Sequence, residues 1–147
     1  MKEFNDEVLL NVKMTRKNMI KCLKRYRKLD ELCLFTNEMR VTSSYSEKII
    51  TQNYGLNKLE KVVDKNIKRE QLLKERENLK KDISESFNIL DEEERFIIEN
   101  KFLKKYTESD ISLYMDLHIG KTKYYDIKNS ALMKMAIFLG LEVYESL

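Results

Sequence analysis

Apolar residues recur at helical spacing along most of the chain. In the first third, Met19, Leu23 and Tyr26 lie four and three positions apart. This spacing places apolar side chains on one face of a helix. We therefore expect a first helix over residues 5–36, within an N-terminal helical region at residues 1–40.

The middle of the chain changes pattern twice. Residues 41–55 are rich in small polar residues, a composition typical of a linker or irregular loop. Residues 57–87 return to helical spacing, with an apolar stripe that is interrupted at Asn66 and Arg76. We expect one long charged helix in the region 56–88. Because the interrupted stripe argues against a strict coiled coil, packing within the chain and dimerisation both stay open.

The last third begins with a strong helix start signal. Asp91 and Glu94 have the spacing of a capping box, in which each side chain accepts the backbone N–H of the other residue. Acidic residues also suit the positive end of a helix dipole. We expect a helix over residues 92–105, at the start of a domain spanning residues 89–147.

Two further helices, separated by a tight turn, are expected in this domain. Thr107 or Ser109 caps a short helix that ends near Met115, and a longer helix covers residues 121–139 before Gly140. Two helices crossing at a fixed angle form either a helix-turn-helix or a plain hairpin in a bundle. The apolar residues that would fix the crossing are Ile111 or Leu113, Leu117, Ile119, Tyr124, Ile127 and Ala131.

The composition supports an all-α, cytoplasmic protein. The 147 residues include no proline and only three glycines, so the usual punctuation of sheets and turns is missing. No apolar run approaches the roughly 20 residues that span a membrane, and the N-terminus does not have the pattern of a signal peptide. Cys22 and Cys33 would lie about 16 Å apart on one helix, too far for a disulfide bond, which favours a reducing compartment.

The distribution of charge is more informative than the net charge of +3. Residues 11–28 contain eight lysines and arginines and no acidic residue. This basic segment is either the solvated face of an amphipathic helix or a surface that contacts phosphates. The sequence leaves both interpretations open.

The outward side chains of the helix over residues 121–139 combine cations with hydroxyl, amide and aromatic groups. Cations suit phosphates, whereas the other groups suit the edges of bases. Arg95 or Lys105 is a further candidate for phosphate contact. The residues expected to bind DNA are Lys121, Thr122, Lys123, Tyr125, Asp126, Lys128 and Asn129.

Catalytic and metal-binding chemistry finds little support. His118 is the only histidine, and neither cysteine is near it in sequence, so the usual spacing of a zinc site is absent. The sequence Gly120-Lys-Thr is similar to the end of a phosphate loop, but Met115 occupies the position of the required upstream glycine. We expect no enzymatic activity, no metal and no cofactor.

The last third also resembles a known family. The stretches Leu90–Ile98, Ser109–Leu113, Leu117–Gly120 and Tyr124–Leu132, together with Tyr106, resemble region 4 of bacterial sigma factors. The stretch Gly120–Leu132, followed by Ala136, Leu139 and the segment 140–144 (GLEVY), resembles the ArpU-type phage transcriptional regulators.

The resemblance implies a regulator of phage or prophage late genes in a bacterial host cell. It also implies promoter DNA as the ligand, no catalytic activity, and residues 121–129 as the start of the recognition helix. Two positions depart from the sigma-like pattern: His118 stands where glycine is usual, and Gly120 where serine is usual. Histidine tolerates the left-handed conformation, and glycine at the cap forgoes one hydrogen bond.

The expected function is a sequence-specific double-stranded DNA-binding regulator of transcription that activates phage or prophage late genes. We also expect it to be a homodimer. Two alternatives stay open. The first is a small sigma-like factor that binds RNA polymerase directly. The second is a helical adaptor protein that does not bind DNA.

Overall fold

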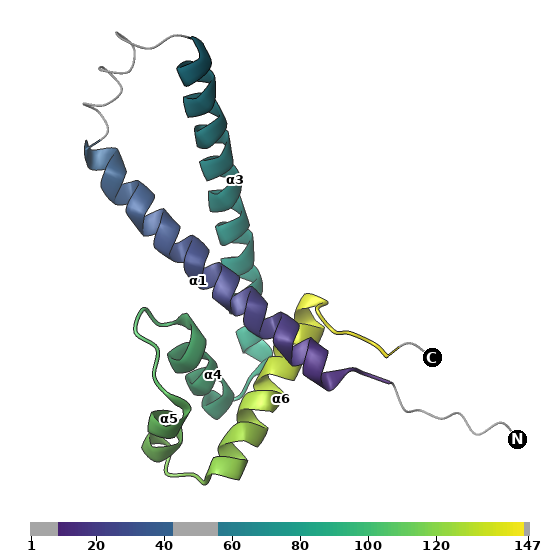
Figure 1. Cartoon of the computed structure of the whole chain (residues 1–147). Coiled ribbons are helices and arrows are strands. Elements are labelled where there is room, and N and C mark those ends of the chain that lie inside the picture. The colour runs from purple at the N-terminus through teal and green to yellow at the C-terminus, as the bar shows by residue number, and fades with distance from the viewer. Residues whose placement is uncertain (1–8, 43–55, 146–147) are drawn as a thin grey trace, which may run out of the picture. The chain divides into compact units, whose positions relative to one another are not determined.

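A computed structural model describes residues 9–42 and 56–145 of the chain. The described residues are mostly helical, which agrees with the expected all-α class. Figure 1 shows the helices, which are α1 (Val12–Thr42), α3 (Leu56–Ser86), α4 (Glu92–Ile98), α5 (Asp110–Asp116) and α6 (Lys121–Leu139).

The chain divides into two compact units. Of the described residues, 9–24 and 82–145 form one, called the terminal unit, and 25–42 and 56–81 form the other, called the hairpin unit. The division falls inside α1 and not at residues 41–55, where the sequence placed a linker. Residues 43–55 of that linker lie outside the described residues, and residues 41 and 42 continue α1.

The first helix begins later than the sequence predicted. Residues 9–11 are not helical, and Leu10 forms an isolated antiparallel bridge with Tyr144. The backbone N–H of Asn11 donates to the Val143 carbonyl at 2.8 Å. This pairing with the C-terminal segment takes the backbone out of the helix, so α1 starts at Val12. The prediction of a helix from residue 5 is therefore wrong at residues 9–11, and residues 5–8 lie outside the described part of the chain.

The first half of α1 completes the core of the terminal unit. Met19 and Leu23 are fully buried, and the buried Thr15 hydroxyl accepts the N–H of Val143 at 3.0 Å. Burial of this apolar face stabilises the unit by about 25 cal/mol per Å². Further buried apolar side chains come from the end of α3, from the connection before α4, and from α4 and α6, and include Ile83, Leu90, Ile98, Leu132, Met135 and Ala136.

The capping box at the start of α4 is confirmed. The backbone N–H of Glu94 donates to Asp91 Oδ1 at 2.8 Å, and the N–H of Asp91 donates back to Glu94 Oε1 at 3.3 Å. The expected helix over residues 92–105 is instead α4 followed by a π-helical turn at Glu99–Leu103. There the buried Asn100 side chain donates to the Phe96 carbonyl at 2.8 Å, occupying a backbone acceptor within the helix.

In the hairpin unit, α3 packs against the second half of α1. Arg25 makes a two-pronged ion pair with Glu75, with both N···O distances 3.0 Å. Arg76, which interrupts the apolar stripe in the sequence, places its guanidinium 2.7 Å from Asp30. The arginine that interrupts the apolar stripe of α3 therefore makes a polar contact with α1.

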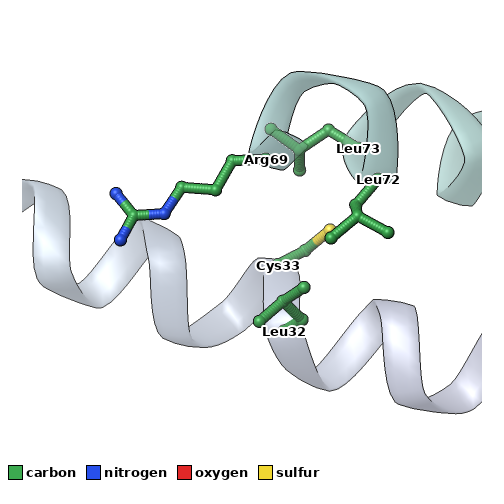
Figure 2. A pocket seen from close by; sticks show the side chains of 5 residues that line it. All are labelled: Leu32, Cys33, Arg69, Leu72 and Leu73. Atoms are coloured by element: carbon green, nitrogen blue, oxygen red, sulfur yellow. The ribbon is translucent and has the colours of Figure 1, made fainter. Parts of the chain in front are cut away.

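A small pocket lies between these two helices (Figure 2). It is lined by Leu32 and Cys33 from α1 and by Arg69, Leu72 and Leu73 from α3. The Arg69 side chain extends away from the leucines. Burial raises the pKa of the Cys33 thiol, which keeps it protonated.

Candidate nucleic-acid interface

Local signals place α5, the turn and α6 as the sequence predicted. Ser109 caps α5, its Oγ accepting the N–H of Ser112 at 3.2 Å. His118 adopts a left-handed conformation with φ 54°, which lets the chain turn within four residues. Gly120 caps α6 without a side-chain hydrogen bond, and Gly140 ends it at φ 72°. The consequences expected from the His118 and Gly120 departures are thus both observed.

Tyr124 is the centre of the small core that sets the crossing of α5 and α6. Its side chain is fully buried together with Ile97 and Leu113. Its ring packs edge-on against Tyr114, with centroids 5.8 Å apart, and against Tyr125 at 5.3 Å. Partly buried apolar side chains surround this core: Phe96, Tyr114, Leu117, Ile119, Tyr125 and Ile127.

The choice between Ile111 and Leu113, which the sequence left open, is decided in favour of Leu113. Leu113 is fully buried, whereas Ile111 is 60% exposed. Ala131 is also fully buried, as expected for a small residue where helices pack closely. The apolar side of α5 that enters the core is therefore centred on Leu113, with Tyr114 and Leu117 packed beside it.

A polar cluster centred on Asp110 ties the start of α5 to α6. The Tyr124 hydroxyl donates to Asp110 Oδ1 at 2.6 Å, and Lys128 Nζ donates to the same oxygen at 3.1 Å. Tyr125 Oη lies 3.5 Å from Oδ2, and Lys101 Nζ lies 3.8 Å from Oδ1. Four side chains thus converge on one carboxylate.

This cluster changes the acidity of its members. Burial raises the pKa of Asp110, but the hydrogen bonds from Tyr124 and Lys128 and the nearby ammonium groups lower it more, so the net pKa is below its ordinary value. Burial and the hydrogen bond to Asp110 raise the pKa of Tyr124. Asp110 is therefore charged, and Tyr124 remains a donor, across the physiological pH range.

Lys128 does not point outward, contrary to the sequence-based expectation. Its side chain is only 13% exposed, and its ammonium lies 5.7 Å from the Phe102 ring centroid and 5.5 Å from that of Tyr125. The reason is spacing: Lys128 is four residues after Tyr124 and three before Ala131, which puts it on the buried stripe of α6. Tyr125 is likewise half-buried against the Asp110 cluster.

The exposed members of the predicted set gather at the beginning of α6. Lys121, Thr122, Lys123 and Asp126 are exposed, and Asn129 is half-buried one turn further along. The first turn of α6 contains no acidic residue, whereas that of α4 contains three. Since the first N–H groups of a helix have no intrahelical acceptor, the start of α6 is a positively polarised end with two added cations.

The two additional phosphate candidates have contacts of their own. Arg95 Nε donates to the Phe87 carbonyl at 2.8 Å, which holds the short 3-10 turn Phe87–Ile89 against α4. The Lys105 ammonium lies 5.6 Å from the centroid of the exposed Tyr106 ring. Sequence reasoning missed the central position of Asp110, for which the available signal was its place directly after the Ser109 cap.

Comparison with known proteins does not assign this geometry to a family. No protein-family model matches the chain, and searches of curated proteins and of solved structures find no significant match.

Within residues 9–42 and 56–145, no helix combines the length and apolar character that crossing a bilayer requires. The same residues contain no cluster of His, Cys, Asp and Glu that would hold a metal ion.

Proposed function

We propose that the chain is a sequence-specific, double-stranded DNA-binding regulator of transcription, in which α5, the turn and α6 act as a helix-turn-helix. The observation that carries the proposal is the beginning of α6. It is exposed, free of acidic residues and of a side-chain cap, and bears Lys121 and Lys123.

Phosphate binding follows from the physics of this helix end. Cations beside the positive end of a helix dipole are unfavourable by about 0.3–1 kcal/mol each, unless an anion lies nearby. A DNA phosphate supplies that anion and accepts from the unpaired N–H groups of the first turn. Lys121 and Lys123 then contribute affinity without sequence preference.

Base reading falls to the polar side chains on the exposed face of α6. Thr122 and Asp126 are four residues apart, and Asn129 follows three residues later, so all three share a face. Asparagine pairs with adenine through two hydrogen bonds, aspartate accepts from cytosine N4, and threonine contacts several bases. These groups give α6 the means to discriminate sequences in a major groove.

The Asp110 cluster holds the reading helix in place. Lys128 and Tyr125 are tied to Asp110 on the side of α6 that faces α5. We assign both a positioning role: they fix the angle at which Thr122, Asp126 and Asn129 are presented. The residues proposed to contact DNA directly are then Lys121, Thr122, Lys123, Asp126 and Asn129.

The biological setting rests on the resemblance to ArpU-type regulators. It makes promoter DNA of phage or prophage late genes the expected ligand. The sigma-like alternative differs in requiring RNA polymerase for promoter binding, whereas the regulator binds duplex DNA alone.

The test selects duplexes from a random library with the purified chain and then measures binding of the enriched sequence and a scrambled control at several salt concentrations. The double variant Lys121→Gln/Lys123→Gln should weaken binding to both duplexes and reduce the salt slope by roughly two units at most. Asn129→Ala should reduce the preference for the enriched duplex by about 1–3 kcal/mol, with little change in slope.

A matched control is Lys68→Gln/Lys80→Gln, which removes two exposed lysines from α3. It should bind as the parent chain does. If no sequence is enriched, or if the α6 variants bind like the control variant, the proposed function is wrong.

A further inference from the structure

The first half of α1 carries a row of exposed lysines. Lys13, Lys17, Lys21 and Lys24 are all exposed and are spaced by four, four and three residues, so they share one face of the helix. We call this row the lysine stripe. The opposite face, with Met19, is buried in the core of the terminal unit. The stripe therefore lies on a rigid, folded surface.

The stripe lacks local neutralisation. Residues 11–28 contain no acidic residue, and among the described residues none of the four lysines makes an ion pair. Three lysines elsewhere do make ion pairs with acidic residues, such as Lys134 with Glu94 at 2.7 Å. Like charges at i,i+4 destabilise a helix by about 0.2–0.5 kcal/mol per pair. The stripe thus has an unfavourable self-energy that a polyanion would relieve.

We propose that the lysine stripe is a second nucleic-acid contact, which binds backbone phosphates outside the sequence that α6 reads. It rests on the proposed function, since the ligand is the same DNA. The stripe covers 11 residue steps, or about 16 Å of helix. One DNA strand has a phosphate about every 3.4 Å along the axis, so the stripe spans roughly five phosphates.

Because of its position, the lysine stripe would contact other DNA phosphates than the start of α6 does. The Asn18 side chain donates to the Leu141 carbonyl at 3.4 Å, and Thr15 accepts from Val143 at 3.0 Å. The beginning of the stripe therefore lies beside the end of α6. The 19 residues of α6 separate its two ends by about 28 Å. The stripe contacts add to those of Lys121 and Lys123 and do not replace them.

A nucleic acid fits the stripe better than an anionic membrane. Amphipathic helices bind membranes by burying their apolar face among the lipids. In α1 that face, which includes Met19 and Leu23, is fully buried in the protein core. Val12 and Met14, at the beginning of α1, are 45% and 41% exposed, and further along this half of the helix the outer surface is formed by the lysines. A surface dominated by charge suits a rigid polyanion.

The test compares two quadruple variants of the full chain, each of which removes four positive charges. The stripe variant is Lys13→Gln/Lys17→Gln/Lys21→Gln/Lys24→Gln. The control is Lys61→Gln/Lys65→Gln/Lys68→Gln/Lys80→Gln, at exposed lysines of α3. The stripe variant should bind the enriched and the scrambled duplex at least about tenfold more weakly, and its salt slope should fall by about 2 to 3.5 units. The control should keep the parental slope.

Folding and the partner class are checked separately. Loss of like-charge repulsion should leave the melting temperature of the stripe variant unchanged or raised, so weaker binding cannot be attributed to unfolding. A stripe variant with the parental salt slope overturns the inference, as does one that loses only binding to phosphatidylserine vesicles. If the Lys121/Lys123 variant binds normally while the stripe variant does not, the proposed role of α6 fails and the stripe inference stands.

Discussion

Asp110, the first residue of α5, and Lys128 of α6 form an ion pair with a 3.1 Å N···O distance across the turn that joins the two helices. Their side chains are only 22% and 13% exposed. The same Asp110 oxygen accepts a 2.6 Å hydrogen bond from Tyr124. This contact connects the beginning of one helix to the middle of the next, so it ties α6 to α5.

Removing the carboxylate should destabilise the terminal unit. Asp110→Ala leaves Lys128 and the Tyr124 hydroxyl without their acceptor, and hydrogen bonds to charged groups contribute about 1.5–3 kcal/mol. We expect the free energy of unfolding to fall by about 2–3 kcal/mol in urea titrations. The exposed Asp126→Ala serves as control and should change stability by less than about 0.5 kcal/mol. Equal effects of the two variants would contradict the role of Asp110.

The stabilising effect of the Asp110 carboxylate should also depend on pH. The pKa of Asp110 is lowered in the folded chain, so its contribution is fully present above the unfolded value of about 3.9 and is lost as pH falls through the folded value. The difference in unfolding free energy between the parent and Asp110→Asn should therefore shrink below about pH 4. Urea unfolding of both chains, followed by circular dichroism at a series of pH values, measures this difference. A difference that stays constant from pH 6 to pH 2 would rule out this linkage.

His118 should be the position of the turn where side-chain shape matters most. Its φ of 54° is unfavourable for branched side chains. We expect His118→Val to lower the melting temperature, at a cost of about 1–2 kcal/mol, and His118→Gly to be neutral or stabilising by up to about 1 kcal/mol. Thermal unfolding of both variants checks the order. If valine and glycine have the same effect, the left-handed turn is not the determinant.

The hairpin unit exposes an apolar row on α3 that suits a second copy of the chain. Leu59, Val63 and Ile67 recur every four residues and are 41%, 53% and 49% exposed. We propose a homodimer, because symmetric partners match paired half-sites in DNA. Light scattering should give a dimeric mass, and Val63→Glu/Ile67→Glu should give a monomer. A parent chain that stays monomeric at high micromolar concentration, with and without DNA, would refute it.

The sequence alone determined the features that depend on a few neighbouring residues. The bounds of α6, the Asp91–Glu94 capping box and the glycine at the end of α6 were all predicted correctly. Helical periodicity, caps and a left-handed stop act over about four residues, so their signals are complete within a short stretch of chain. The polar, cationic start of α6 belongs to the same class.

Only the tertiary structure decided which distant groups meet. Lys128 finds its partner 18 residues away, and Thr15 binds Val143 across 128 residues, which places half of α1 in the terminal unit. No local pattern contains such pairings, because a lysine on a helix looks the same in sequence whether it faces solvent or a buried carboxylate. The choice depends on the free energy of packing whole elements, where burial of Met19 and Leu23 in the core of the terminal unit outweighs the local preferences of each segment.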